Sequence, residues 1–202
     1  MKKLNFFFLS IILLSARLST YAQPDQLRFS HIGTREGLSH SNVISILRDS
    51  RGFMWFGTRD GLNRYDGYTF TTFKNDPQDS GSISNNTIIS MLEDSEGYIW
   101  IATWGGGLNR FDRNTEKFLR FQHDPAVSTS LASNLLNTLM LDRNNQLWIG
   151  TEDAGFERFD RHGKTFVHTP NNNTLLHASV KSIYQDATQR VWIGTNENGL
   201  RF

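Results

Sequence analysis

The chain has 202 residues, with 21 basic and 20 acidic side chains, and it contains no cysteine. The absence of cysteine excludes disulfides, thiolate nucleophiles, cysteine-ligated zinc and iron–sulfur clusters, and the near-neutral charge argues against a nucleic-acid-binding surface, which needs a basic surplus. The 15 Phe, 5 Trp, 5 Tyr and 16 Gly, with only 4 Pro, indicate short strands joined by tight turns.

The first 22 residues have the pattern of a secretory signal peptide. Lys2 and Lys3 form a positively charged start, residues 4–14 are almost all apolar, and residues 20–22 place small side chains at a cleavage site. The apolar run is shorter than the ~20 residues of a membrane-spanning helix, so we expect cleavage before Gln23 rather than an uncleaved anchor. No cysteine follows this position, which excludes a lipoprotein anchor.

Cleavage changes the charge of the mature chain. It removes Lys2, Lys3 and Arg17 but no acidic residue, which leaves 18 basic and 20 acidic side chains and a net charge of −2. No later apolar stretch is long enough to span a membrane. We therefore expect an exported mature chain that binds no nucleic acid and does not contact the membrane, unless a segment beyond residue 202 anchors it.

The mature chain is built from a repeat of about 45 residues. Four tryptophans are spaced 45, 48 and 44 residues apart, and each begins a phrase close to Trp-Ile-Gly-Thr: Trp55, Trp100, Trp148 and Trp192. An aspartate lies six residues before each of them: Asp49, Asp94, Asp142 and Asp186. A phrase close to Gly-Leu-Asn-Arg-aromatic-Asp follows the first three, at residues 61–66, 107–112 and 155–160. Strand-rich repeats of this length are typical of the blades of a β-propeller.

Each unit is expected to form four short antiparallel strands. In the first unit these are residues 43–47, 53–58, 62–65 and 69–73, and the first strand recurs at residues 88–92, 136–140 and 180–184. Every second strand holds a small residue at one position, as expected where neighbouring backbones pack closely: Gly57, Ala102, Gly150 and Gly194.

The turn between the first and second strands begins at the repeated aspartate. An aspartate there can accept hydrogen bonds from the backbone of the turn, whereas a calcium loop would need alternating oxygen ligands and a terminal glutamate. Three residues after the aspartate, Gly52, Gly97 and Asn145 suit a left-handed conformation. Gln189 does not, so the fourth turn is expected to differ.

The sequence predicts an all-β fold, a β-propeller of four-stranded antiparallel blades. Residues 27–29 match the outer strand at residues 119–121, so residues 23–38 are expected to hold an orphan outer strand and a lead-in. Three whole blades follow at residues 39–75, 84–123 and 132–168, and a partial blade at residues 178–202. A blade cannot bury both of its faces alone, so we expect either the start of a longer protein or a four-bladed ring closed by residues 27–29.

The repeated phrases resemble the two-component regulator propeller repeat. The resemblance rests on residues 49–66, 94–112 and 142–160, and in part on residues 186–202. The linkers Asn75-Asp76-Pro77 and His123-Asp124-Pro125 fit the pattern too, as does Gly37-Leu38-Ser39. The chain departs from the pattern at three places: Ala102 stands for Gly, Phe156-Glu157 stands for Leu-Asn, and one residue is missing in Gly199-Leu200-Arg201.

This resemblance implies a role in signal transduction. In that family the repeats form the periplasmic sensor of hybrid two-component histidine kinases of Bacteroidetes, and the ligands are generally oligosaccharides. It therefore implies a periplasmic location, an inner-membrane anchor of the parent protein beyond residue 202 and an oligosaccharide ligand. It also implies a phosphorelay in the parent and a kinase part beyond residue 202, so that this chain itself is not an enzyme. It also leaves open a homodimer of the parent.

Two other functions compete with the sensor. One is a free-standing exported propeller that acts as a binding or scaffold module. The other is a propeller enzyme, such as a polysaccharide lyase or glycosidase, which would need paired carboxylates that converge on one face. The acidic residues stand mostly at repeated turn positions, which favours a structural role for them over catalysis.

Trp104 is the candidate ligand-binding residue. It is the one tryptophan outside the repeated register, and it lies in a glycine-rich loop at residues 103–107. A loop aromatic flanked by glycines can stack on a sugar ring or dock a partner, and the alternative is a side chain that only anchors its loop. The four repeated tryptophans are instead expected in the core between blades.

No other group of residues points to a metal, a cofactor or catalysis. His31, His123 and His168 each lie two residues after an outer-strand phenylalanine, on different blades, which is too far apart to share a metal ion. The chain has no Gly-x-Ser-x-Gly elbow and no glycine-rich phosphate loop. We therefore expect no catalytic, cofactor-binding or metal-binding residues.

Overall fold

The computed structural model of the chain describes residues 28–168 and 175–202. The chain divides into a short unit, Met1–His31, and a large unit, Ile32–Phe202. The expected signal peptide, residues 1–22, lies outside the described residues. No helix in the described ranges is long and apolar enough to cross a membrane.

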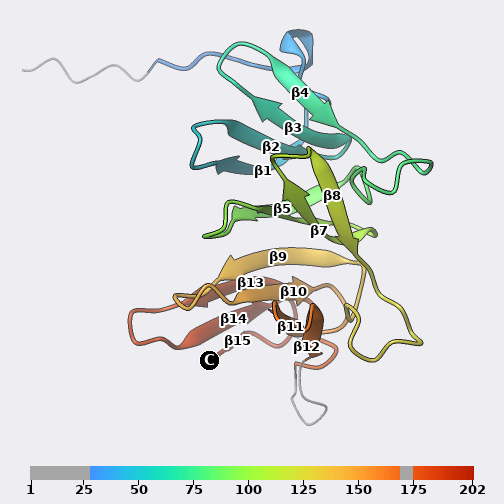
Figure 1. The fold of residues 1–202 in the computed structure, drawn as a ribbon. Helices are drawn as coiled ribbons and strands as arrows, with labels where there is room; N and C mark the ends of the chain where they lie inside the picture. Colours follow the sequence, from blue (N-terminus) through green and yellow to red (C-terminus); the bar gives the residue numbers. More distant parts are fainter. Residues whose placement is uncertain (1–27, 169–174) are drawn as a thin grey trace, which may run out of the picture. The chain divides into compact units, whose positions relative to one another are not determined.

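The strands of the large unit form four antiparallel sheets (Figure 1). The first contains β1 (Val43–Arg48), β2 (Met54–Thr58), β3 (Gly61–Tyr65) and β4 (Phe70–Phe73). The second contains β5 (Ile88–Glu93), β6 (Ile99–Thr103), β7 (Gly107–Asp112) and β8 (Lys117–Phe121). The third contains β9 (Leu136–Leu141), β10 (Leu147–Thr151), β11 (Phe156–Asp160) and β12 (Thr165–His168). The fourth contains β13 (Val180–Gln185), β14 (Val191–Thr195) and β15 (Leu200–Arg201).

Within every sheet each strand pairs with the next one in sequence, and a 3-10 turn, η1 (Thr34–Glu36), precedes β1. The predicted blades, three whole and a partial fourth, are confirmed. Of the expected orphan outer strand, Leu27 lies outside the described residues, and Arg28 and Phe29 belong to no strand. A strand without a paired neighbour has no ladder hydrogen bonds to offset the cost of ordering its backbone.

The hydrophobic core lies between successive sheets. Trp55 and Leu62 of the first sheet pack with Ile99 and Phe111 of the second, and all four side chains are at most 1% exposed. Similar clusters join the second sheet to the third and the third to the fourth. The rings of Trp55 and Phe111 meet edge to face with centroids 5.3 Å apart, a favoured aromatic geometry. The predicted core role of the repeated tryptophans is confirmed for Trp55 and for Trp100, which is equally buried.

A small residue in the second strand lets neighbouring sheets approach. Gly57 of β2 pairs with Ser45 of β1, and a Cβ atom at Gly57 would lie 2.7 Å from Cγ2 of Ile88 in the next sheet. A Cβ atom at Gly150 would lie 2.7 Å from Cγ1 of Val180. Both distances are well below a normal carbon contact of ~3.5–4 Å. The predicted close packing is therefore confirmed at these positions, as a contact between blades.

The first strands of the four sheets lie side by side. β1 contacts β5, β5 contacts β9, and β9 contacts β13, and the sheets follow one another in sequence order (Figure 1). Each first strand therefore forms the inner edge of its blade. The loops between second and third strands lie at one end of these sheets, and the turns between first and second strands lie at the other.

The prediction that the fourth turn differs is wrong. Gln189 has a φ of 68°, close to the 60° of Asn145. The backbone N–H of Gln189 donates to the carbonyl of Asp186 (3.1 Å), and the Asp186 carboxylate accepts from the N–H groups of Thr188 (2.8 Å) and Arg190 (3.0 Å). These hydrogen bonds offset a left-handed cost of roughly 1–2 kcal/mol, so a glutamine is accommodated where glycine or asparagine is easier.

Candidate ligand-binding site

The repeated aspartates are occupied by structural hydrogen bonds. In the first blade Oδ1 of Asp49 accepts from the N–H groups of Arg51 (2.9 Å) and Phe53 (3.0 Å), and Oδ2 accepts from the indole N–H of Trp55 (2.8 Å). The other three aspartates bind their turns and the tryptophan six residues on in the same way, at indole distances of 2.7, 3.1 and 2.8 Å. The predicted turn role is confirmed. The link to the indole was not predicted, although the fixed spacing of six residues was its signal.

Arginines of the following blade reach these aspartates from outside. Arg113, which is 7% exposed, lies 3.5 Å from Oδ2 of Asp49 and 2.8 Å from Oε1 of Glu93. Arg161 lies 3.0 Å from Oδ2 of Asp94. Charged groups at this end of the sheets therefore pair with one another and hold successive blades together.

At the opposite end of the sheets, two positions carry side chains that differ among the repeats. One position is the residue after the repeated threonine: Arg59, Trp104, Glu152 and Asn196. The other is the second residue of the first strand: Ile44, Ile89, Asn137 and Lys181. We call these eight residues the variable rim.

Repeated backbone hydrogen bonds hold three of the eight residues of the variable rim. The N–H of Trp104 donates to the carbonyl of Thr87 (3.0 Å), that of Glu152 to Leu135 (2.9 Å), and that of Asn196 to Ser179 (2.9 Å). The threonine before each varied residue is fixed as well: the Thr103 hydroxyl, for example, donates to the carbonyl of Gly107 (2.8 Å). Different side chains thus stand on one rigid frame, an arrangement typical of binding loops on a structural scaffold.

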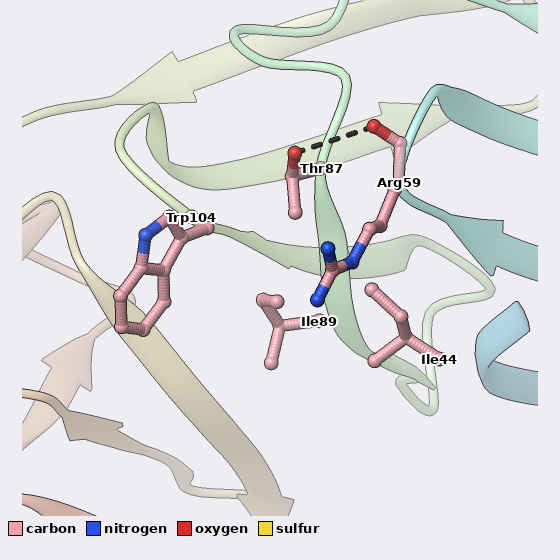
Figure 2. Close-up of a pocket in the computed structure, with 5 residues that line it drawn as sticks. All are labelled: Ile44, Arg59, Thr87, Ile89 and Trp104. Atoms are coloured by element: carbon pink, nitrogen blue, oxygen red, sulfur yellow. Dashed lines mark hydrogen bonds between the residues drawn. The ribbon is translucent and has the colours of Figure 1, made fainter. Parts of the chain in front are cut away.

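A pocket opens on the variable rim between the first and second blades. It has a volume of about 410 Å³ and is lined by Ile44, Arg59, Thr87, Ile89 and Trp104 (Figure 2). Its size falls within the range of small-molecule sites. Trp104 is 40% exposed, so part of its indole ring is available to a ligand. The structure thus places the candidate residue Trp104 at a pocket, and its role in binding stays a prediction.

The pocket is bounded by groups that are tied together. The Thr87 hydroxyl donates to the backbone carbonyl of Arg59 (3.3 Å), and the Thr87 carbonyl accepts from Trp104 (3.0 Å). Trp104 also forms an isolated β-bridge with Leu135 of the third blade. The loop that carries the indole is therefore held by two neighbouring segments, which reduces the ordering cost of ligand binding.

At the boundary between the third and fourth blades, the variable rim carries a polar network. Oε2 of Glu152 accepts from Nζ of Lys181 (2.5 Å), from Nδ2 of Asn137 (2.7 Å) and from Oγ of Ser179 (2.8 Å). These donors, Lys181 above all, lower the pKa of Glu152 to about 2. The Glu152 carboxylate is therefore ionised at neutral pH, and it forms an ion pair with Lys181.

Glu157 is a buried acid that is not one of the eight residues of the variable rim. It stands in β11 at the position of Asn63 and Asn109, is 0% exposed, and accepts from the N–H of Ala132 at 3.1 and 3.2 Å. Burial raises its pKa to about 8, because an apolar environment disfavours the carboxylate. Nδ1 of the His168 ring lies 3.8 Å from Oε2 of Glu157.

The histidines do not form a shared site in the described structure. Nδ1 of His123 lies 2.7 Å from the carbonyl of Leu131, His168 lies beside Glu157, and His31 belongs to the short unit. Within residues 28–168 and 175–202, no group of three or more His, Asp or Glu side chains is placed to hold a metal ion.

Sequence reasoning found one of the five pocket residues. It selected Trp104 because that tryptophan breaks the repeat, and it missed Ile44, Arg59, Thr87 and Ile89. Aligning the units and looking for positions that differ, rather than positions that recur, would have found Arg59 as the counterpart of Trp104. The pocket forms where the first and second blades meet, and the sequence of one repeat read alone does not predict that contact.

Comparison with known proteins gives the family. The family model described as the two-component regulator propeller matches at residues 37–60, 82–105, 130–153 and 174–197. The chain is also 47% identical over 76 residues to histidine kinase P4 of Formosa agariphila, an alignment that covers 37% of this chain and 6% of that protein.

Solved structures are similar over most of the chain. The extracellular domain of BT3049 from B. thetaiotaomicron, described as a hybrid two-component system, matches with a TM-score of 0.72 and 27% identity over 85% of this chain and 30% of that one. The extracellular domain of BT4673, described as a one-component system, matches with a TM-score of 0.65 and 26% identity over 79% of this chain and 23% of that one. This chain therefore spans less than a third of each of these relatives. With four matching repeats folded as successive blades, it belongs to the two-component regulator propeller family.

Proposed function

We propose that this chain is part of the periplasmic, ligand-sensing propeller of a hybrid two-component signalling protein, and that its ligand is an oligosaccharide. Family membership supports the signalling role, and the two similar solved structures are extracellular domains of signalling systems. Histidine kinase P4 supports a parent protein whose kinase part lies outside these residues. The expected signal peptide supports export.

The observation that carries this proposal is the pocket on the variable rim. Its walls combine an exposed indole, two isoleucines and polar groups from Arg59 and Thr87. A sugar ring presents the same combination, because its C–H face is apolar and its edge carries hydroxyls. An aromatic side chain with nearby donors can therefore contact both parts of the ring.

Replacement of Trp104 by alanine tests the proposal. We expect the full chain to bind at least one oligosaccharide on an array of defined glycans, and Trp104→Ala to weaken that binding by about tenfold or more, since the stacking surface is lost. Isothermal titration with the oligosaccharide that binds gives the affinities. The proposal fails if no glycan binds or if the variant retains its affinity.

Tyr68→Ala is the matched control. Tyr68 is 92% exposed and stands between β3 and β4, at the end of the first sheet that lies away from the variable rim. Its removal deletes an exposed aromatic ring of similar character but does not alter the pocket, so we expect unchanged affinity.

A further inference from the structure

The pocket contains a cation without an acidic partner. In Figure 2 the Arg59 side chain extends toward Ile89 and Ile44, on the side of the pocket that faces Trp104. Among the described residues, no carboxylate lies within ion-pair distance of its guanidinium. The backbone carbonyl of Arg59 accepts a hydrogen bond from the Thr87 hydroxyl.

The acids around Arg59 are engaged elsewhere. Asp60, the next residue, forms an ion pair with Lys74 (2.6 Å) and accepts from Asn86 (3.3 Å). Glu152, the acid of the variable rim, is bound by Lys181. The Arg59 charge is therefore not neutralised by these acids, in contrast to the charge of Arg113, which pairs with Asp49 and Glu93.

The Arg59 side chain is exposed and is accessible to an anion that enters the pocket. Ile44 and Ile89 line the pocket beside it (Figure 2). A guanidinium keeps its charge at all physiological pH values and donates two parallel hydrogen bonds to a carboxylate or sulfate. The indole can at the same time cover the ring that carries the anionic group.

We infer that the pocket recognises an anionic sugar, in which Trp104 packs on the pyranose ring and Arg59 binds its carboxylate or sulfate. This inference rests on the proposed function and deepens it by naming the class of oligosaccharide. Thr87 and the backbone around Trp104 fix the spacing between the stacking surface and the charge. The ligand class is therefore uronate-containing or sulfated oligosaccharides, rather than neutral ones.

The test compares acidic and neutral probes of equal length. Oligogalacturonates are titrated against their methyl esters, and sulfated galacto-oligosaccharides against unsulfated ones, by calorimetry with the full chain. We expect at least one acidic probe to bind ten times more tightly than its neutral counterpart, with weaker binding as salt is raised. The two pairs distinguish a carboxylate from a sulfate as the anion that is recognised.

Arg59→Gln assigns the preference to this side chain. We expect it to remove the tenfold preference for the acidic probe, and Arg59→Lys to restore part of it, because an ammonium keeps the charge without the two-pronged geometry. Arg51→Gln is the matched control: it removes the same charge from the opposite end of the first sheet and should change nothing. Equal unfolding midpoints show that the variants are folded.

The outcomes separate the inference from the proposed function. Equal binding of acidic and neutral probes, or an unchanged preference in Arg59→Gln, overturns the inference. If Trp104→Ala still weakens binding of a neutral sugar in that case, the proposed function stands. If no probe binds and Trp104→Ala has no effect, both fail.

Discussion

A buried asparagine of the third strand forms the same hydrogen bond in the first and second blades, and the third blade departs from this pattern. Asn63 and Asn109 each donate from Nδ2 to a serine hydroxyl, at 2.8 and 2.7 Å. At the matching positions of the third blade stand Glu157 and Ala132, so a carboxyl group replaces the amide and the hydroxyl is gone. The third blade therefore buries an acid where the first and second blades bury a hydrogen-bonded asparagine.

The buried acid predicts a stability that depends on pH. Because the folded pKa of Glu157 is raised to about 8 from 4.5, the folded state holds this proton more tightly than the unfolded state. The stabilisation of the folded state that results from this tighter proton binding is fully present below pH 4.5, and it is lost as the pH rises toward 8. We expect Glu157→Gln to remove this loss, worth roughly 3–5 kcal/mol, so that the variant is the more stable protein at pH 8.

Urea unfolding at pH 5 and pH 8 measures the effect. Glu197→Gln, which changes an exposed glutamate of the fourth blade, should leave the pH dependence of the parent chain intact. If the free energies of unfolding of the parent chain and of Glu157→Gln change in parallel between pH 5 and pH 8, Glu157 titrates as an ordinary surface acid.

Elements were predictable where a repeat enforces them. The strands begin and end within about a residue or two of the expected positions, because alternation and turn residues are local signals repeated four times. The conformation of Gln189 was missed, since residue type alone argues against it and the hydrogen bonds of Asp186 decide it. The contacts of Arg113 and the pocket around Arg59 arise only when two blades meet, so one repeat read alone does not contain them.

The close contact between the first and second blades at Gly57 leads to a prediction about the stability of the chain. A methyl group at position 57 would meet Ile88 of the next blade at 2.7 Å and the Ser45 hydroxyl. We expect Gly57→Ala to lower the free energy of unfolding by about 1–3 kcal/mol, the usual cost of overpacking. Chemical denaturation followed by tryptophan fluorescence measures this change.

Gly194→Ala is the matched control for Gly57→Ala. It alters the same strand position in the fourth blade, where the added methyl would meet only Ser182, at 2.5 Å from its hydroxyl oxygen. A serine hydroxyl can rotate away, so a smaller loss is expected. Equal losses in the two variants would place the cost within the sheet rather than between blades.

In the whole molecule, burial is greatest in the middle blades. All five residues of β6 are buried, whereas the burial of β2 and β14 is partial. In a stack of repeats each unit is stabilised by its neighbours, and local opening follows the density of buried contacts. We therefore expect the amides of β6 and β10 in the 202-residue chain to exchange with deuterium more slowly than those of β2 and β14.

Hydrogen exchange read by mass spectrometry tests this order. Equal protection in all four second strands would contradict it, and would indicate instead that the first and fourth blades cover each other, as in a closed four-bladed ring. The peptide that contains β10 serves as the internal reference, because its strand is covered by a blade on each side.

The separation between the frame of hydrogen bonds and the side chains of the variable rim has an evolutionary consequence. A substitution after the repeated threonine alters the surface that a ligand meets without removing a core contact, so mutations there escape the usual conflict between new specificity and folding stability. Duplication or loss of one repeat would shift the order of these side chains by one blade while preserving the contacts between blades. Proteins built this way can diverge in what they recognise much faster than in how they fold.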